Sequence, residues 1–207
     1  MLTSIEGAAA QLPPHSQARK DLETAKDAGR QSARLISHML GRGAVMTEGP
    51  LAIACVIAEA QTLLTRVLGS TVALQIDTPA TTWPVHATAD ELWQIVLNLT
   101  VNARDAMPRG GSLALRTRNT AVAAGAPLGL PPGDYVVLSA QDSGSGIDAE
   151  TQALIFQPFF STKGSRGTGL GLATIARITA ARGGVVRVES TPGQGTTFAI
   201  YLPRART

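Results

Sequence analysis

The sequence predicts an α+β protein: a helical hairpin followed by a two-layer α/β sandwich, in which helices cover one face of a mixed sheet. Two observations favour this architecture. Helical and strand-like segments follow one another from residue 50 onward, and the chain ends in two strand-like runs joined by the turn TPGQG. Before residue 45, helical patterns occur on both sides of Pro13-Pro14. We therefore expect two domains, residues 1–45 and residues 50–204.

The N-terminal domain begins with the pattern of a helix end, which Pro13 and Pro14 terminate. A second helical pattern starts near Ala18, and the segment Gly41-Arg42-Gly43 ends it. Two helices joined by a short loop form a hairpin. Because one arm is short, this hairpin buries little apolar surface, and we expect it to pack on the next domain or on a second copy of itself.

The second domain is predicted to open with a helix over Leu51–Leu68, then the strand-like TVALQID, then the clearest helix of the chain, TADELWQIVLNLTVNARDAM. Thr88 and Glu91 have the spacing of a capping box at the start of this helix, and Pro108 with the following glycines ends it. Its apolar face is formed by Leu92, Ile95, Val96, Leu99, Ala103 and Ala106.

The remaining elements alternate between strands and a helix. Two strands, SLALRTRN and YVVLSAQ, flank a loop rich in alanine, glycine and proline from Ala121 to Gly133. A helix over Leu170–Ala181 follows. The strands VVRVES and TTFAIYLP, joined by TPGQG, then form a β-hairpin.

Composition excludes several classes of protein. A content of 44% hydrophobic and 16% charged residues is typical of a soluble globular protein, and a net charge of +3 with scattered basic residues does not indicate a nucleic-acid partner. The single cysteine, Cys55, excludes a disulfide framework and is predicted to be a buried small hydrophobe. The longest apolar segment carries Glu59 and Arg66, which favours a packed helix over a membrane span, and no signal peptide is visible. We expect this fragment to be cytoplasmic. This expectation is compatible with a membrane anchor elsewhere in a longer parent protein.

Two asparagines on the clearest helix are candidate metal ligands. Asn98 and Asn102 are four residues apart, so they lie on one face at the edge of the apolar stripe, with Asp105 beside them. Their amides either hydrogen-bond a neighbouring loop or coordinate Mg²⁺, whose other ligands are phosphate oxygens and water. The spacing alone leaves both interpretations open.

The segment DSGSGI directly follows a strand. Asp142 at the strand end can accept a hydrogen bond from an exocyclic amine, and Gly144 and Gly146 permit the close approach of a flat ring. By itself the segment could also be a simple turn.

The stretch GSRGTGLGLATI places a glycine-rich backbone at the start of a predicted helix. Such a helix start offers unpaired N–H groups and a positive dipole end to a phosphate group, and Lys163 and Arg166 add positive charge. The alternative is a flexible loop. The stretch lacks the Gly-Lys-Ser/Thr of a P-loop and the spacing of a dinucleotide-binding motif.

In combination and in this order, these segments resemble the ATP-binding domain of sensor histidine kinases, a GHKL or Bergerat-type domain of the ATPase superfamily shared with gyrase, MutL and heat-shock chaperones. NLTVNARDAM resembles the N box, DSGSGI the G1 box, IFQPFF the F box and GTGLGL the G2 box. The ending STPGQGTTFAIYLP is similar to the last β-hairpin of the family. The likeness covers residues 50–203 and implies the Bergerat ATP-binding fold.

The resemblance also implies roles for individual residues. Asn98 and Asn102 would hold Mg²⁺ and the phosphates of ATP, Asp142 would bind the adenine amino group, and Asn102 and Lys163 would be catalytic. The further nucleotide contacts that it implies are Asp105, Gly144, Gly146, Ile147, Phe160, Arg166, Gly167, Thr168, Gly169, Leu170, Gly171, Leu172 and Thr196.

In such kinases the γ-phosphoryl group passes to a histidine on the first helix of a dimerising hairpin, and then to an aspartate of a response-regulator receiver domain. Residues 1–40 look like the remainder of this hairpin, but none of His15, His38 and His86 precedes an acidic residue as that motif requires. We therefore expect the phosphoacceptor upstream of this chain, and we expect the fragment to be either a weak homodimer or a monomer. A non-enzymatic pseudokinase scaffold and a hydrolytic ATPase of the same superfamily are the alternatives.

Overall fold

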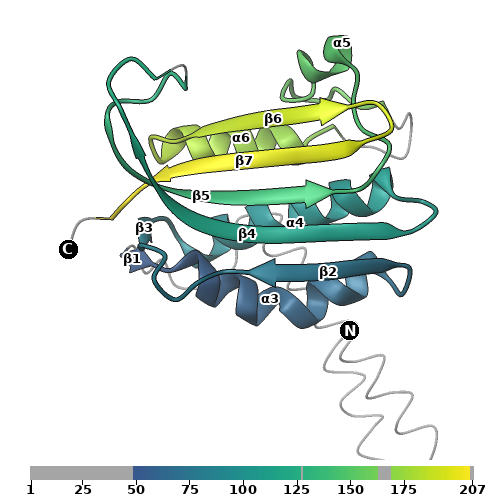
Figure 1. Ribbon diagram of the computed structural model, residues 1–207, viewed down its shortest axis with the longest axis horizontal. Helices are drawn as coiled ribbons and strands as arrows, with labels where there is room; N and C mark the ends of the chain where they lie inside the picture. Colours follow the sequence, from purple (N-terminus) through teal and green to yellow (C-terminus); the bar gives the residue numbers. More distant parts are fainter. Residues whose placement is uncertain (1–48, 127, 163–168, 206–207) are drawn as a thin grey trace, which may run out of the picture. The chain divides into compact units, whose positions relative to one another are not determined.

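The computed structural model of the 207-residue chain describes residues 49–126, 128–162 and 169–205. The predicted hairpin of residues 1–45 lies outside these residues and stays a prediction. The described part confirms the expected sandwich, because helices α3, α4 and α6 cover one face of a mixed sheet (Figure 1).

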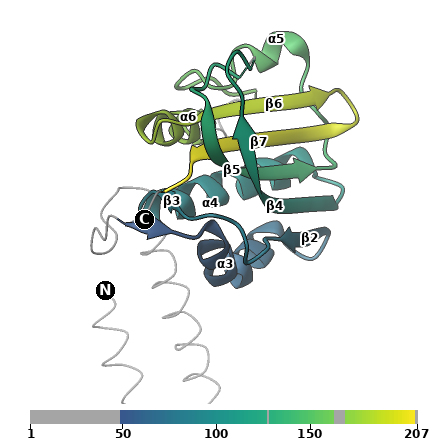
Figure 2. The same ribbon diagram turned by 60° about the vertical axis from the view of Figure 1, so that its left-hand side comes forward.

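The sheet has five strands in the order β2-β4-β5-β7-β6. Only β2 and β4 pair in parallel, whereas all other neighbours are antiparallel. The strands are β2 Val72–Asp77, β4 Gly111–Val122, β5 Gly133–Asp142, β6 Val185–Thr191 and β7 Gly195–Pro203. The predicted β-hairpin at the end of the chain is thus confirmed as β6 and β7 (Figures 1 and 2).

The three covering helices bury one apolar stripe each against the sheet. They are α3 Ile53–Leu68, α4 Ala89–Ala106 and α6 Gly171–Ala181. The largest fully buried side chains come from these helices and from the facing side of the sheet: Ile53, Ile57, Leu64, Leu92, Ile95, Leu99, Leu113, Leu115, Leu138, Ile175, Ile200 and Leu202. The core therefore lies in a single layer between sheet and helices.

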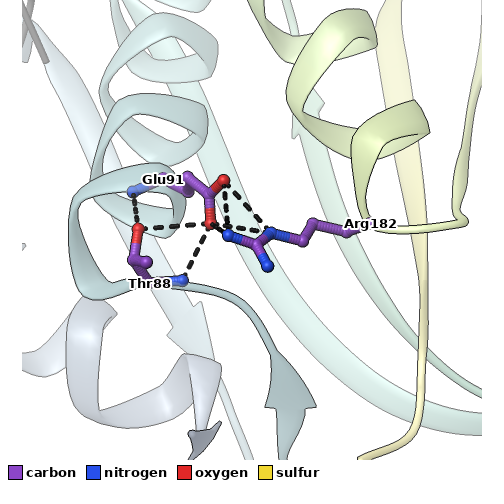
Figure 3. A network of polar contacts seen from close by, with 3 residues as sticks. All are labelled: Thr88, Glu91 and Arg182. Atoms are coloured by element: carbon purple, nitrogen blue, oxygen red, sulfur yellow. Dashed lines mark hydrogen bonds and ion pairs between the residues drawn. The ribbon is translucent and has the colours of Figure 1, made fainter. Parts of the chain in front are cut away.

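The start of α4 is fixed in the way that the sequence predicts. Thr88 Oγ1 accepts a hydrogen bond from the Glu91 N–H at 3.2 Å, and Glu91 Oε2 accepts one from the Thr88 N–H at 2.8 Å, which completes the capping box. Glu91 also binds Arg182, which follows the last residue of α6 (Figure 3). The first turn of α4 is therefore joined to the end of α6, and the two helices run antiparallel.

Three elements were not predicted. The strands β1 Pro50–Leu51 and β3 Val85–His86 form a small antiparallel pair, and the four-residue helix α5 Ala149–Gln152 begins at Asp148, whose side chain accepts from the Thr151 N–H. Each is too short to leave a periodic pattern in the sequence. In the described part of the chain, no helix has the length and apolar character needed to cross a membrane.

The prediction that Cys55 is buried was wrong, because the structure exposes it. The buried face of α3 is formed by Ile53, Val56, Ile57, Ala60, Leu64 and Leu68. Cys55 lies two residues before Ile57 and therefore about 160° around the helix axis from it. The apolar run that surrounds Cys55 continues on both faces of this helix, so the composition of the run did not identify the buried side.

Candidate functional site

The asparagine pair of α4 lies against the start of α6. Asn98 and Asn102 are both half-buried, and Gly171 is the first residue of α6. A Cβ atom added to Gly171 would lie 3.4 Å from Asn98 Oδ1 and 3.8 Å from Asn102 Nδ2. The absence of a side chain at Gly171 therefore lets the start of α6, where the first N–H groups of the helix lack intrahelical partners, lie close to both asparagine amides.

Asn102 has an unsatisfied polar atom beside the start of α6. Its Nδ2 is buried and has no hydrogen-bond partner among the described residues, although buried side-chain polar atoms are nearly always paired. A half-turn of the amide would present its oxygen at the same place. Asn102 is therefore suited to donate to an anionic oxygen or to ligate a hard cation.

Asp105 lies nearby on α4, three residues after Asn102. Its carboxylate accepts hydrogen bonds from Arg104 Nε at 3.0 Å and Nη2 at 2.7 Å. The structure therefore places Asp105 in an ion pair at the edge of the site.

Asp142 forms the opposite end of the site, at the end of β5. The residue is 6% exposed and accepts hydrogen bonds from the Gly144 N–H, at 2.8 Å, and from the Thr196 N–H. Burial raises the pKa of Asp142, and the two N–H groups offset part of that rise. Since neither donor is charged, a further hydrogen-bond donor from a ligand would stabilise the ionised carboxylate.

The loop after Asp142 is held tightly against its surroundings. Gly146 has φ +69°, and a Cβ atom there would collide with the carbonyl oxygen of Thr191, the last residue of β6 before the β6–β7 turn. The Gly193 N–H of that turn donates to Ser145 O at 2.7 Å. Gly144 approaches Ala106, the last residue of α4. This loop thus connects the end of α4 with the β6–β7 turn at one end of the sheet (Figure 1).

Asp142, Thr196 and Ser190 form a row across β5, β7 and β6, because Thr196 pairs with both of the others. Ser190 Oγ accepts from the Ile147 N–H at 2.8 Å and lies 2.9 Å from Thr196 Oγ1. Gln152 Nε2 donates to Ile147 O at 2.7 Å and to Ser190 O at 3.0 Å. These bonds hold Ile147 against the end of the β-hairpin.

Ser190 and Gln152 are two functional candidates that sequence reasoning missed. A signal for Ser190 was present, since it continues the alternation of Val186 and Val188 on the face that packs on the core. A polar residue at a core-facing position needs a partner. Gln152 offers no comparable signal, because its contacts depend on α5.

In the phenylalanine-rich segment and at the start of α6, some side chains pack against the core and others are exposed. Phe160 and Leu172 are partly buried against the core. Phe159 is 78% exposed at φ 67°, and its N–H donates to Gly169 O at 3.0 Å. Leu170 is 43% exposed.

Several predicted site residues cannot be placed in this geometry. Lys163, Arg166, Gly167 and Thr168 lie outside the described residues, as do His15 and His38. His86 is exposed in β3. The described site therefore brings together Asn98, Asn102 and Gly171 at one end, and Asp142, Gly144, Gly146, Ile147 and Thr196 at the other.

This arrangement matches known proteins. Residues 87–206 match the family described as histidine kinase-, DNA gyrase B- and HSP90-like ATPase. The sensor kinase CckA of Brucella abortus (strain 2308) is 42% identical over 190 residues, which cover 89% of this chain and 20% of CckA, so the chain spans only a small part of that relative.

Solved structures show the same fold. The mycobacterial sensor histidine kinase MprB matches with a TM-score of 0.61 and 26% identity, over 78% of this chain and 100% of the MprB chain. Full-length ShkA, solved in complex with AMPPNP, matches with a TM-score of 0.63 and 25% identity, over 100% of this chain and 43% of ShkA.

Proposed function

Since the chain belongs to the family of histidine kinase-, DNA gyrase B- and HSP90-like ATPases, we propose that it is the ATP-binding catalytic part of a two-component sensor histidine kinase. In this proposal the bound ATP gives its γ-phosphoryl group to a histidine. The names of the relatives support the reaction, and the AMPPNP in the ShkA complex, an analogue of ATP, supports the ligand.

One observation carries the proposal: the buried carboxylate of Asp142 lies at one end of the candidate site, and at the other end lies the buried Nδ2 atom of Asn102, which has no hydrogen-bond partner among the described residues. Asp142 fits a neutral donor such as the adenine amino group, because burial and two N–H groups already surround it. Asn102 fits an anionic or cationic group, because its amide is unsatisfied beside the start of α6. Adenine and a metal-bound triphosphate have these two chemistries in one molecule.

At the phosphate end, Asn98 and Asn102 would hold Mg²⁺, which neutralises phosphate charge when bound. The N–H groups at the start of α6, which lies beside these asparagines, would orient the phosphates. Phosphoryl transfer needs positioning and charge stabilisation more than covalent participation of the protein. On the sequence alone, we extend this phosphate role to Lys163, Arg166, Gly167 and Thr168.

The phosphoacceptor is proposed to lie outside this chain, because none of its three histidines precedes an acidic residue. The proposed partners are a histidine-bearing dimerisation hairpin, of which residues 1–45 form a part, and a response-regulator receiver domain. Since ATP is a cytoplasmic metabolite, we propose that this part of the protein works in the cytoplasm.

Titration of Mg-ATP into the 207-residue chain tests the proposal. We expect binding by the wild type and its loss in both Asn102→Ala and Asp142→Ala, whereas Asp134→Asn, which alters an exposed ion pair with Arg204, should bind normally. Unchanged ATP affinity in both site variants would refute the site. Radiolabel from ATP on His15 or His38 would refute the external phosphoacceptor.

A further inference from the structure

Ser190 stands at the centre of the hydrogen bonds behind the candidate adenine end of the site. It is the last core-facing residue of β6 and pairs with Thr196 in the ladder. Its Oγ lies 2.8 Å from Ile147 N, 2.9 Å from Gly195 O and 2.9 Å from Thr196 Oγ1. All three distances are typical of hydrogen bonds.

The number of protons fixes the direction of these bonds. A serine hydroxyl has one proton to donate and two lone pairs that accept. The Ile147 N–H can only donate and Gly195 O can only accept, so Ser190 accepts from the first and donates to the second. The third bond therefore has Thr196 as its donor. The reverse direction would leave Ser190 Oγ and Gly195 O facing each other as two acceptors.

This direction determines what Thr196 offers to a ligand. Its single hydroxyl proton points to Ser190, so that only acceptor lone pairs remain. Thr196 is 4% exposed and pairs in the ladder with Asp142, which is 6% exposed and, when ionised, is also purely an acceptor. The edge formed by Asp142 and Thr196 therefore presents acceptors alone.

We propose that Ser190 is a positioning residue that fixes Thr196 as a hydrogen-bond acceptor and thereby favours a purine with an amino group, rather than an oxo group, at position 6. The inference rests on the proposed function, since it assumes that adenine meets Asp142. An amino group donates to this edge. An oxo group is itself an acceptor, so it would face the two acceptors of Asp142 and Thr196 with no proton to share. Burial makes such an unsatisfied contact costly.

The test compares ATP with inosine triphosphate, whose base has the 6-oxo group. Both are titrated with Mg²⁺ into the 207-residue wild type and into Ser190→Ala by calorimetry. In the variant the Thr196 hydroxyl is free to turn and donate to the oxo group, so the ratio of the two Kd values should fall by roughly three- to tenfold, the value of one hydrogen bond. Ser139→Ala is the matched control, because Ser139 is likewise a strand serine whose hydroxyl lies within reach of a backbone carbonyl, Arg116 O, at 3.5 Å.

The outcomes separate the inference from the proposed function. A loss of affinity that is equal for both nucleotides would make Ser190 merely structural and overturn the inference. An unchanged ratio would do the same, while leaving ATP binding itself intact. A wild type that binds neither nucleotide would overturn the proposed function together with the inference. If Ser190→Ala does not fold, Ser190→Cys keeps a side chain of similar shape whose sulfur is a weaker donor and acceptor, and the result is read in the same way.

Discussion

The ion pair between Glu91 and Arg182 gives the sharpest prediction on stability (Figure 3). Arg182 Nε lies 3.1 and 3.0 Å from the two carboxylate oxygens, and Nη2 lies 2.9 Å from Oε1. The side chains are only 25% and 24% exposed, so water competes less for this pair than for one on the open surface. We expect Glu91→Gln to weaken the join between α4 and α6.

The substitution isolates the charge. A capping box accepts Gln as well as Glu at this position, so the bond to the Thr88 N–H is retained. What is lost is the difference between charge-assisted and neutral hydrogen bonds, together with the negative charge that faces a partly buried guanidinium. We estimate a loss of about 2 kcal/mol in the free energy of unfolding at neutral pH, which lowers Tm by about 4–8 °C in a domain of this size.

The effect should depend on pH in a defined direction. Burial raises the pKa of Glu91, but the hydrogen bonds from Arg182 and Thr88 outweigh burial and hold the pKa below its ordinary value. A lowered carboxyl pKa stabilises the folded state above the ordinary pKa, and this contribution is lost as the pH falls through the lowered value. The difference between wild type and Glu91→Gln should therefore be full at neutral pH and shrink below about pH 4.

Thermal and urea unfolding over this pH range is the assay. The matched control is Asp134→Asn, the same chemical change in an ion pair with Arg204 whose side chains are 43% and 41% exposed. It should cost less than about 1 kcal/mol. Equal stability of Glu91→Gln and wild type at neutral pH, or a loss that does not change with pH, would refute the reasoning.

Three further predictions concern the site. Gly171→Ala places a methyl group 3.4 Å from Asn98 Oδ1. The affinity for ATP, measured by titration, should therefore fall roughly tenfold, which is the equivalent of one good hydrogen bond. Tm should stay the same or rise, because alanine favours the helix. Gly146→Ala forces a side chain to φ +69° and against Thr191 O, so it should cost about 3 kcal/mol or more in urea unfolding. ATP should lower the raised pKa of Asp142 by donating to the carboxylate. Binding at mildly acidic pH, where part of the free protein carries a protonated Asp142, should therefore release protons, which calorimetry in two buffers detects as a buffer-dependent enthalpy.

The sequence predicted most of the architecture because periodicity and caps are local. The capping box of Thr88 and Glu91 and the β6–β7 hairpin were predicted in this way. The motifs also identified Asn98, Asn102 and Asp142, and the fold brings their elements to one end of the sheet. Their roles toward a nucleotide stay predictions.

The rest of the site depends on contacts between residues far apart in the chain. Arg182 meets Glu91 across 91 positions, and Ser190 meets Ile147 across 43. Neither spacing leaves a periodic signal, so only the packing of α6 on α4 and the position of the β6–β7 turn reveal these partners. The same limit explains why the predicted burial of Cys55 was wrong, because its exposure depends on which face of α3 packs against the sheet.

The two ends of the site are therefore held by different kinds of structure. Strand register aligns Asp142, Thr196 and Ser190, and backbone hydrogen bonds of the ladder fix that register. The phosphate end instead depends on side-chain packing between α4 and α6, with Gly171 at one end of α6 and Arg182 just beyond its other end. Loosening the packing of α6 on α4 should thus disturb the surroundings of Asn102 more than the acceptor edge, because the register of that edge is fixed by ladder bonds and its contact with α4 is made through the loop beside Ala106. We therefore expect a substitution in the α4–α6 packing to change the affinity for the phosphates more than the affinity for the base.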